Sequence, residues 1–271
     1  MPRQITAFSN PLIKQVRGLR EKKNRRREGL FLAEGLRILT EAREAGRLPE
    51  ILLFASGHSH PLLFELIDAT EAAGGDVVET NADIIGKVTA KDNPQVVIGA
   101  YRMFGGGLDA LDRSASPLWI VAQALRDPGN IGTILRTGDA VGAGGLILVD
   151  DCADPFSVEA VRASMGAVFT QAVAAAPWDE FVRWLRAGPG ELVGTSLKAT
   201  LDYQEPRYQP PTFILVGNEQ AGLPQDYERE CDLLVKMPML GKADSLNAAV
   251  ATAVMAYEII NQRRKLRISR G

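Results

Sequence analysis

The stretches GNIGTILR (residues 129–136), GNEQAGL (217–223) and MPMLGKADSLN (237–247) decide the fold of this chain. Each places small, amide, hydroxyl or charged side chains where a strand is expected to end and a helix to begin. Open α/β sheets bind their ligands at that edge. We therefore expect the three stretches, although far apart in sequence, to line one site.

Apolar segments and helical segments alternate around these stretches. Strands are predicted at 119–125, 146–149, 192–195, 213–216 and 233–237, with helices at 130–141 and 245–263. Continuous apolar strands separated by helices are typical of a mostly parallel sheet that is covered on both faces. The second half of the chain is therefore predicted to be an α/β domain.

The first hundred residues predict a smaller α/β module. A basic helix or helix pair is expected at 10–27, further helices at 36–45, 61–73 and 82–88, and strands at 51–55, 76–79 and 96–103. Residues 104–117 are rich in glycine and small polar residues and show no periodicity. We therefore predict domains at 1–105 and 118–271, joined by a linker at 106–117.

Composition sets the broad class. With 271 residues, 46 % of them hydrophobic and 24 % charged, the chain is long enough for two cores of a soluble protein. No apolar run approaches the roughly 18 residues of a membrane span, and the N-terminus lacks the apolar stretch of a signal peptide, so we expect a cytoplasmic protein without a membrane partner. Cys152 and Cys231 are far apart, which does not favour a disulfide framework.

Charge is unevenly distributed although the net charge is only −2. Residues 1–30 contain nine cations and two acids, and the last eleven residues add five cations without an acid (Arg263, Arg264, Lys265, Arg267 and Arg270). Such clusters suit phosphate backbones, and the alternative is a solvated helix with a basic tail. The candidate RNA contacts near the N-terminus are Lys14, Arg17, Lys22, Lys23, Arg25, Arg26 and Arg27.

Each candidate site residue also has a structural interpretation. Asn130 could cap the helix that follows it, and Asp244 or Ser245 could cap the last helix. Capping does not explain Arg136, because an arginine in a helix that packs on a sheet is costly unless it meets an anion. Glycine at position 217, directly after a strand, would let a ligand approach the backbone closely.

Several other chemistries are not supported. Gly241-Lys242 lacks the rest of a phosphate-binding loop, because Lys236 precedes it by five positions and Ala243 follows it. No glycine-rich dinucleotide fingerprint follows a strand. The histidines are His58 and His60, both in the first domain, so a histidine-based triad or a zinc site is not expected in the second.

Taken together, the three stretches resemble the SpoU branch of the SPOUT RNA methyltransferases. Asn130 with Leu135-Arg136-Thr137, the segment Gly217-Asn218-Glu219 through Leu223, and the segment Pro238-Met239 through Asn247 match its three motifs in order and spacing. The first 105 residues also resemble the substrate-binding domain often joined to this branch, which is related to certain RNA-binding ribosomal proteins. Residues 10–14 (NPLIK) and 31–35 (FLAEG) carry that second likeness.

The resemblance implies a methyl transfer from S-adenosylmethionine to a ribose 2′-hydroxyl. It further implies a deep trefoil knot at the C-terminal end, which sequence alone would exclude, and a homodimer with active sites at the subunit interface. The implied cofactor-binding residues are Thr195, Ser196, Leu197, Gly217, Met237 and Leu246. The implied polar, catalytic centre is Asn130, Arg136, Glu219, Ser245 and Asn247.

Residue chemistry suggests roles for that centre. A guanidinium does not deprotonate readily in a protein, so our hypothesis is that Arg136 grips a phosphate while Asn130 and Asn247 orient it and Ser245 lies near the hydroxyl. The separate N-terminal domain favours ribosomal RNA as the substrate. A transfer RNA methyltransferase, an antibiotic-resistance methyltransferase and a non-catalytic RNA-binding assembly factor are the alternatives.

Overall fold

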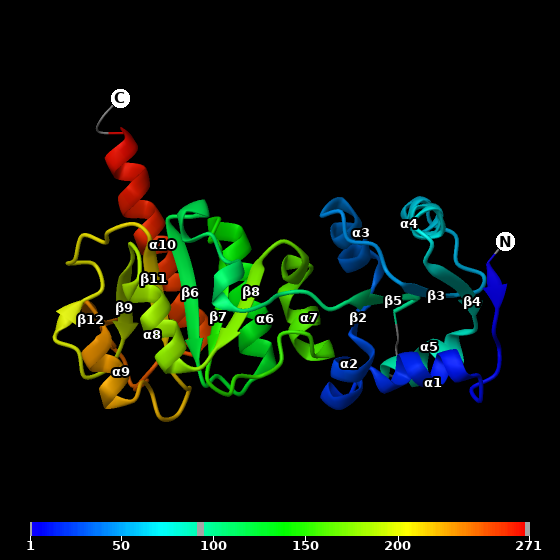
Figure 1. Ribbon diagram of the computed structural model, residues 1–271, viewed down its shortest axis with the longest axis horizontal. Helices are drawn as coiled ribbons and strands as arrows, with labels where there is room; N and C mark the ends of the chain where they lie inside the picture. Colours follow the sequence, from blue (N-terminus) through cyan, green and yellow to red (C-terminus); the bar gives the residue numbers. More distant parts are fainter. Residues whose placement is uncertain (1, 91–94, 269–271) are drawn as a thin grey trace. The chain divides into compact units, whose positions relative to one another are not determined.

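The computed structural model describes residues 2–90 and 95–268, with the backbone alone for 266–268, and divides into two compact units (Figure 1). Arg270, one of the five cations near the C-terminus, lies outside the described residues, and the side chain of Arg267 is not described. The first unit comprises the chain up to Phe104 together with Asp154–Thr170, and the second comprises the rest.

The first unit is built on a five-stranded mixed sheet of order β1-β4-β3-β5-β2. Its strands are β1 (Arg3–Gln4), β2 (Leu30–Glu34), β3 (Ile51–Ala55), β4 (Asp76–Thr80) and β5 (Val97–Arg102). Its first five helices are α1 (Pro11–Gly18), α2 (Lys22–Glu28), α3 (Leu36–Glu44), α4 (Pro61–Ala72) and α5 (Ala82–Thr89). Helices α3 and α4 cover one face, and α1 and α5 cover the other (Figure 1). The predicted elements are confirmed, with β1 and β2 added.

A segment distant in sequence completes the first unit. Residues 154–170 contain α7 (Val158–Ser164) and a 3-10 turn, and α7 packs against β2. The rings of Phe156 and Phe169 lie 4.8 and 5.6 Å from the ring of Phe31 on β2, centroid to centroid. The core of this unit therefore draws on residues that the sequence analysis assigned to the second domain.

Arg25 on α2 connects residues 154–170 to the turn between α1 and α2. Its side chain is 3 % exposed, its Nη2 lies 2.6 Å from Asp154 Oδ2, and its Nη1 donates to the carbonyls of Leu19 and Arg20. The prediction that Arg25 contacts RNA is therefore wrong, because its donors are used internally. The other six predicted contacts of this region are exposed: Lys14, Arg17, Lys22, Lys23, Arg26 and Arg27.

The second unit is an entirely parallel seven-stranded sheet of order β10-β12-β9-β11-β6-β7-β8. Its strands are β6 (Leu118–Gln123), β7 (Gly145–Val149), β8 (Ala172–Ala176), β9 (Glu191–Thr195), β10 (Leu201–Asp202), β11 (Thr212–Val216) and β12 (Leu233–Lys236). Its helices are α6 (Pro128–Val141), α8 (Trp178–Arg186), α9 (Gln225–Glu230) and α10 (Ala248–Ile268). The predicted parallel α/β sheet is confirmed, and β8, β10, α8 and α9 are additional.

Helices cover both faces of this sheet. Helices α6 and α10 pack together against β6, β7 and β11, while Phe181 and Leu185 of α8 pack with Trp119 and Phe213 on the opposite face. Because all strands run in one direction, the carboxyl ends of β6, β9, β11 and β12 lie at the same edge. Within 2–90 and 95–268, no helix is both long enough and apolar enough to cross a membrane.

The predicted linker is ordered and belongs to the second unit. Leu108 is buried, Gly106 forms a β-bridge with Ala174, and Arg113 Nη1 donates to the carbonyl of Leu185 at 2.9 Å. The guanidinium carbon of Arg113 also lies 3.9 Å from the ring centroid of Trp184. A glycine-rich, aperiodic sequence is thus held by long-range contacts within the second unit, and the linker at 106–117 stays a prediction.

The buried ion pair gives a stability test. Replacing Arg25 by Met leaves Asp154 without its cation, so we expect the free energy of unfolding to fall by about 3–5 kcal/mol. The matched change Arg102→Met breaks the exposed pair with Glu50, in which the arginine side chain is 72 % exposed, and should cost less than about 1 kcal/mol. Urea unfolding of both variants measures the difference, and equal losses would contradict a structural role for Arg25.

Candidate active site

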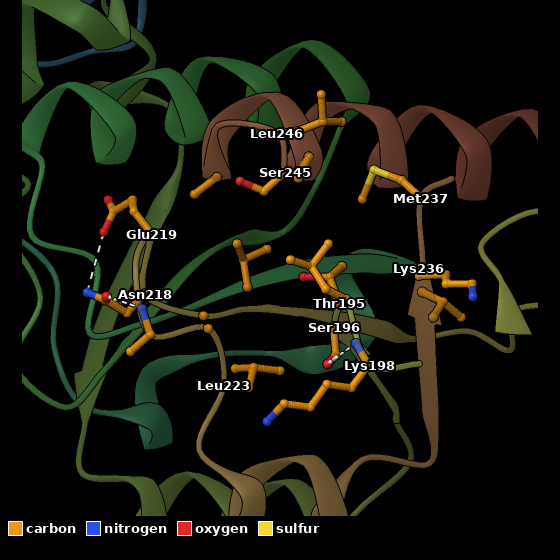
Figure 2. A pocket seen from close by; sticks show the side chains of 18 of the residues that line it. Thr195, Ser196, Lys198, Asn218, Glu219, Leu223, Lys236, Met237, Ser245 and Leu246 are labelled. Atoms are coloured by element: carbon orange, nitrogen blue, oxygen red, sulfur yellow. Dashed lines mark hydrogen bonds between the residues drawn. The ribbon is translucent and has the colours of Figure 1, made fainter. Parts of the chain in front are cut away.

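A pocket of about 250 Å³ opens at the carboxyl edge of the parallel sheet (Figure 2). It is bordered by the ends of β9, β11 and β12 and by the segment that leads into α10. All six residues predicted to bind a cofactor border it: Thr195, Ser196, Leu197, Gly217, Met237 and Leu246. The fold thus brings residues 195–197, 217 and 237–246 to one pocket, whereas no residue of the stretch 129–136 borders it.

The pocket combines apolar walls with a few polar groups. Figure 2 shows Asn218 and Glu219 at one end, Met237 at the other, and Ser245 and Leu246 on the wall toward α10. Val216, Leu223 and Val235 add to the apolar lining. Leu197 and Leu246 are 63 % and 39 % exposed, so large apolar groups face the opening. Such a lining suits a ligand with a flat apolar part and a few polar groups.

One polar group of the pocket was not expected from the sequence. Glu228, on the short helix α9, borders the pocket and accepts a hydrogen bond of 2.6 Å from the Ser196 hydroxyl. Glu228 belongs to none of the three sequence motifs, and the residues around it show no apolar periodicity. Only the tertiary structure brings its carboxylate to the cofactor wall.

Gly217 is required by its own loop. A Cβ at this position would lie 2.6 Å from the carbonyl carbon of Gly222 and 2.7 Å from the backbone nitrogen of Leu223. The loop thus folds back on itself, with a β-bridge between Asn218 and Gly222. Gly217 also borders the pocket, so the close approach of a ligand to its backbone stays a prediction.

Asn218 fixes this loop to the neighbouring strand. Its Oδ1 accepts from the backbone N–H groups of Gln220 and Ala221, both at 3.0 Å, and its Nδ2 donates to the carbonyl of Ala124 at 2.9 Å. Ala124 follows β6 and has a φ of 50°, a conformation that L-residues rarely adopt. The sequence signal was an asparagine in a turn after a strand, but nothing local identified Ala124 as its partner.

A chain of hydrogen bonds forms the polar centre. Asn247 Nδ2 donates to Asn130 Oδ1 at 2.9 Å, and Asn130 Nδ2 donates to Glu219 Oε1 at 2.9 Å. Asn130 is buried. The chain therefore links α10, α6 and the loop after β11 through three predicted site residues.

Helix capping fixes the direction of this chain. Asn247 Oδ1 accepts from the backbone N–H groups of Ala249 and Val250, so its Nδ2 is left to donate. Asn130 then accepts with its Oδ1 and donates with its Nδ2 to the carboxylate oxygen Oε1 of Glu219. Asn247 is thus the cap of α10 in place of Asp244 or Ser245, and Asp127 rather than Asn130 caps α6.

Arg136 does not join this centre within one chain. It lies on α6, is exposed, and forms no hydrogen bond or ion pair with any residue that the structure describes. It does not border the pocket, whereas Glu219 and Ser245 do. Within this chain the two asparagines therefore do not orient Arg136, because Asn130 bonds to Asn247 and Glu219 while Asn247 bonds to Asn130 and to the start of α10.

The two thiols of the second unit are unreactive. Burial raises the pKa of Cys231 to about 12 and raises the pKa of Cys152 above its usual value. Both thiols stay protonated at neutral pH. Neither thiol borders the pocket, whose polar side chains carry amide, hydroxyl, carboxylate and ammonium groups.

Comparison with known families agrees with this geometry. The model of the SpoU rRNA Methylase family matches residues 117–257, which include the whole pocket. The chain belongs to the SpoU family. The MRM3-like substrate binding domain matches residues 10–99, within the first unit.

Relatives of the SpoU chain match over nearly its full length. A 23S rRNA (uridine(2479)-2′-O)-methyltransferase of Streptomyces viridochromogenes is 32 % identical over 96 % of this chain and 93 % of its own. The 23S rRNA (guanosine(2553)-2′-O)-methyltransferase RlmP of Bacillus subtilis is 30 % identical over 95 % of this chain and 99 % of its own. The AdoMet-bound rRNA methyltransferase of Sinorhizobium meliloti superimposes with a TM-score of 0.89 at 39 % identity, covering 97 % and 98 % of the two chains.

The SpoU chain is therefore an S-adenosylmethionine-dependent RNA 2′-O-methyltransferase, and its pocket fits that cofactor. The apolar lining suits the adenine ring and the methylene groups of the methionine-derived chain, while Glu219 and Glu228 complement the positive charges of the ligand. When bound, the cofactor supplies a methyl group on a positively charged sulfur. Thr195, Ser196, Leu197, Gly217, Met237 and Leu246 would hold it.

The back-folded loop gives a binding test. Gly217→Ala should lower the affinity for S-adenosylmethionine by tenfold or more, because the added methyl displaces Gly222 and Leu223 from the pocket wall. Gly241→Ala is the matched control, since its Cβ would meet no atom within 4 Å. Isothermal titration calorimetry measures both, and equal affinities for the two variants would contradict the assigned role of Gly217.

Proposed function

We propose that this enzyme methylates a ribose 2′-hydroxyl of ribosomal RNA. The observation that carries the proposal is the hydrogen-bonded chain Asn247–Asn130–Glu219 beside a pocket bordered by all six expected cofactor residues. Two relatives of at least 30 % identity are named as 23S rRNA methyltransferases, and they act on different nucleotides. The substrate class is thus supported, while the target nucleotide differs among such enzymes.

Methyl transfer to a hydroxyl group places two requirements on the protein. The hydroxyl oxygen must lie in line with the methyl group, and its proton must leave as the new bond forms. In our proposal Ser245, which borders the pocket, lies near the target hydroxyl, and the two asparagines hold the Glu219 carboxylate in one orientation. The guanidinium of Arg136 binds a phosphate of the target nucleotide.

We further propose a homodimer whose sites lie at the subunit interface. Val250 and Tyr257 of α10 are seven residues apart, on one face of the helix, and are 48 % and 55 % exposed. Together with Val141 and Val254 they adjoin or line an open groove of about 530 Å³ along α6 and α10. An apolar face of this kind favours a partner, and the exposed Arg136 on α6 is then available to the pocket of the second subunit.

Two further features are inferred from family membership. One is a deep trefoil knot at the C-terminal end, formed by the segments around 217–223 and 237–247 that border the pocket. The other is a cytoplasmic site of action, where ribosomal RNA is available. The knot and the cytoplasmic site of action are part of our proposal, together with the rRNA substrate.

The substrate is tested by mapping 2′-O-methylated nucleotides in ribosomal and transfer RNA by mass spectrometry. We expect one ribosomal position to lose its methyl group in a deletion strain. Wild-type protein should restore it, and the Gly217→Ala variant should restore it poorly because its cofactor wall is displaced. A methyl group lost from transfer RNA would make that RNA the substrate. Loss from neither pool would contradict the proposal and favour a non-catalytic role.

The shared site is tested with mixed dimers. Arg136→Ala and Gly217→Ala subunits carrying different tags are co-expressed, and the mixed species is purified on both tags. If Arg136 serves the partner's pocket, one of the two sites is intact, and the mixed dimer should show about half of the wild-type methyl incorporation into ribosomal RNA. If Arg136 serves its own pocket, the mixed dimer is as inactive as either parent.

The recovery of the mixed species tests the dimer itself. Sedimentation velocity of the wild-type protein gives its mass independently of activity. A monomer in solution, together with no protein retained on both tags, would contradict the dimer while leaving the proposed reaction untouched.

A further inference from the structure

A second hollow lies in the first unit and shares no residue with the cofactor pocket. It has a volume of about 200 Å³ and forms between α1, α5 and the turn that precedes α1. Six residues line it: Phe8, Ile13, Lys14, Arg17, Lys87 and Val88. Of these, Phe8 and Lys87 were not among the expected RNA contacts.

The floor of this hollow is fixed by the core. Ile13 of α1 and Val88 of α5 are 2 % and 0 % exposed and belong to one apolar cluster with Val16 and Ile84. The start of α1 is also fixed, because Asn10 Oδ1 accepts from the N–H of Leu12 and Pro11 begins the helix. The hollow is therefore a preformed feature of two packed helices.

The rim of the hollow carries one aromatic ring and three cations. Phe8 is 37 % exposed, and Lys87 Nζ lies 3.6 Å from its ring centroid. Lys14 and Arg17, three residues apart on α1, are exposed on the same side of the helix. In the part of the chain that the structure describes, none of these three cations forms an ion pair, and no acidic residue lines the hollow.

Three cations that form no ion pair, one of them placed over a partly exposed aromatic ring, match the chemistry of a nucleotide. Proteins read single-stranded RNA by stacking bases on aromatic side chains and by tracking phosphates with basic ones. An acidic peptide would be attracted by the cations but would gain little from the ring and the apolar floor. The combination therefore favours a nucleic acid over an acidic protein segment.

We propose that this hollow binds one nucleotide of a single-stranded segment of the RNA substrate. The base lies against Phe8 and the apolar floor, and Lys14, Arg17 and Lys87 contact the flanking phosphates. The proposal rests on the proposed function, since it assumes an RNA substrate. It assigns recognition to one site on the first unit, apart from Lys22, Lys23, Arg26 and Arg27 of α2, which do not line the hollow.

The test uses the full-length protein and a short fluorescein-labelled oligouridine, with affinity measured by fluorescence anisotropy over a range of salt concentrations. Phe8→Leu removes the ring, so we expect affinity to fall roughly tenfold with the salt dependence unchanged. The double change Lys14→Gln and Arg17→Gln should flatten the slope of log K against log salt by about 0.7 for each phosphate that is no longer neutralised.

Matched controls come from elsewhere in the same unit. Phe64 is a 50 % exposed phenylalanine on α4, across the sheet, and Arg102 is an exposed arginine on β5. Phe64→Leu and Arg102→Gln should bind oligouridine as the wild type does. All variants should keep the wild-type circular dichroism and urea unfolding midpoint, which shows that the first unit is folded. Their affinity for S-adenosylmethionine, measured by calorimetry, reports on the second unit alone.

Two results would overturn the proposal. One is an unchanged affinity for Phe8→Leu with an unchanged salt slope for the double variant. The other is competition by polyglutamate as strong as that by unlabelled oligouridine, since this would identify a general anion surface. Methyl transfer to ribosomal RNA by the wild-type enzyme is measured in parallel. If the wild-type enzyme methylates ribosomal RNA but the variants of the hollow bind oligouridine normally, this inference alone is overturned. If the wild-type enzyme does not methylate ribosomal RNA, the proposed function is overturned.

Discussion

The site depends on the capping of one helix. Asn247 uses its side-chain oxygen to satisfy the first N–H groups of α10, which leaves its amide nitrogen to donate to Asn130. That donation orients Asn130, which in turn directs its own nitrogen to Glu219. The capping of α10 thus sets the direction of the hydrogen bonds that connect α10, α6 and the loop after β11. Because each amide has both groups engaged, neither can turn without leaving a buried donor or acceptor unpaired.

The parallel sheet explains why these segments meet. Seven strands running in one direction place their carboxyl ends at a common edge, so the loops after β6, β9, β11 and β12 are neighbours despite separations of up to about a hundred residues. Gly217 and Asn218 then make the loop after β11 compact enough to border the pocket without filling it. The pocket that would hold the cofactor and the hydrogen-bonded residues beside it are therefore both built from the loops at this edge of the sheet.

Hydrophobic periodicity predicted the helices and strands whose own sequence has a clear apolar pattern. The strand at 51–55 was predicted with its observed bounds, because an apolar run bounded by polar and turn residues leaves one solution. Strand β8 was missed, since its sequence AVAAA has little β-propensity and is held by pairing with β7. The cofactor residues followed from the family resemblance together with the sheet edge. Asp154, Leu185 and Ala124, the long-range partners of Arg25, Arg113 and Asn218, could not be predicted, because each lies more than seventy residues away in the sequence.

The return of residues 154–170 to the first unit limits how this enzyme can be divided. The chain passes between the units three times, after Phe104, after Ala153 and after Thr170. A gene cut after Phe104 would release a fragment that lacks Asp154, Phe156 and Phe169, with the Arg25 guanidinium buried and uncompensated. The first unit is therefore not a cassette that recombination can move in one piece. Exchange of substrate specificity between such enzymes would have to carry an internal segment of the methyltransferase sequence with it.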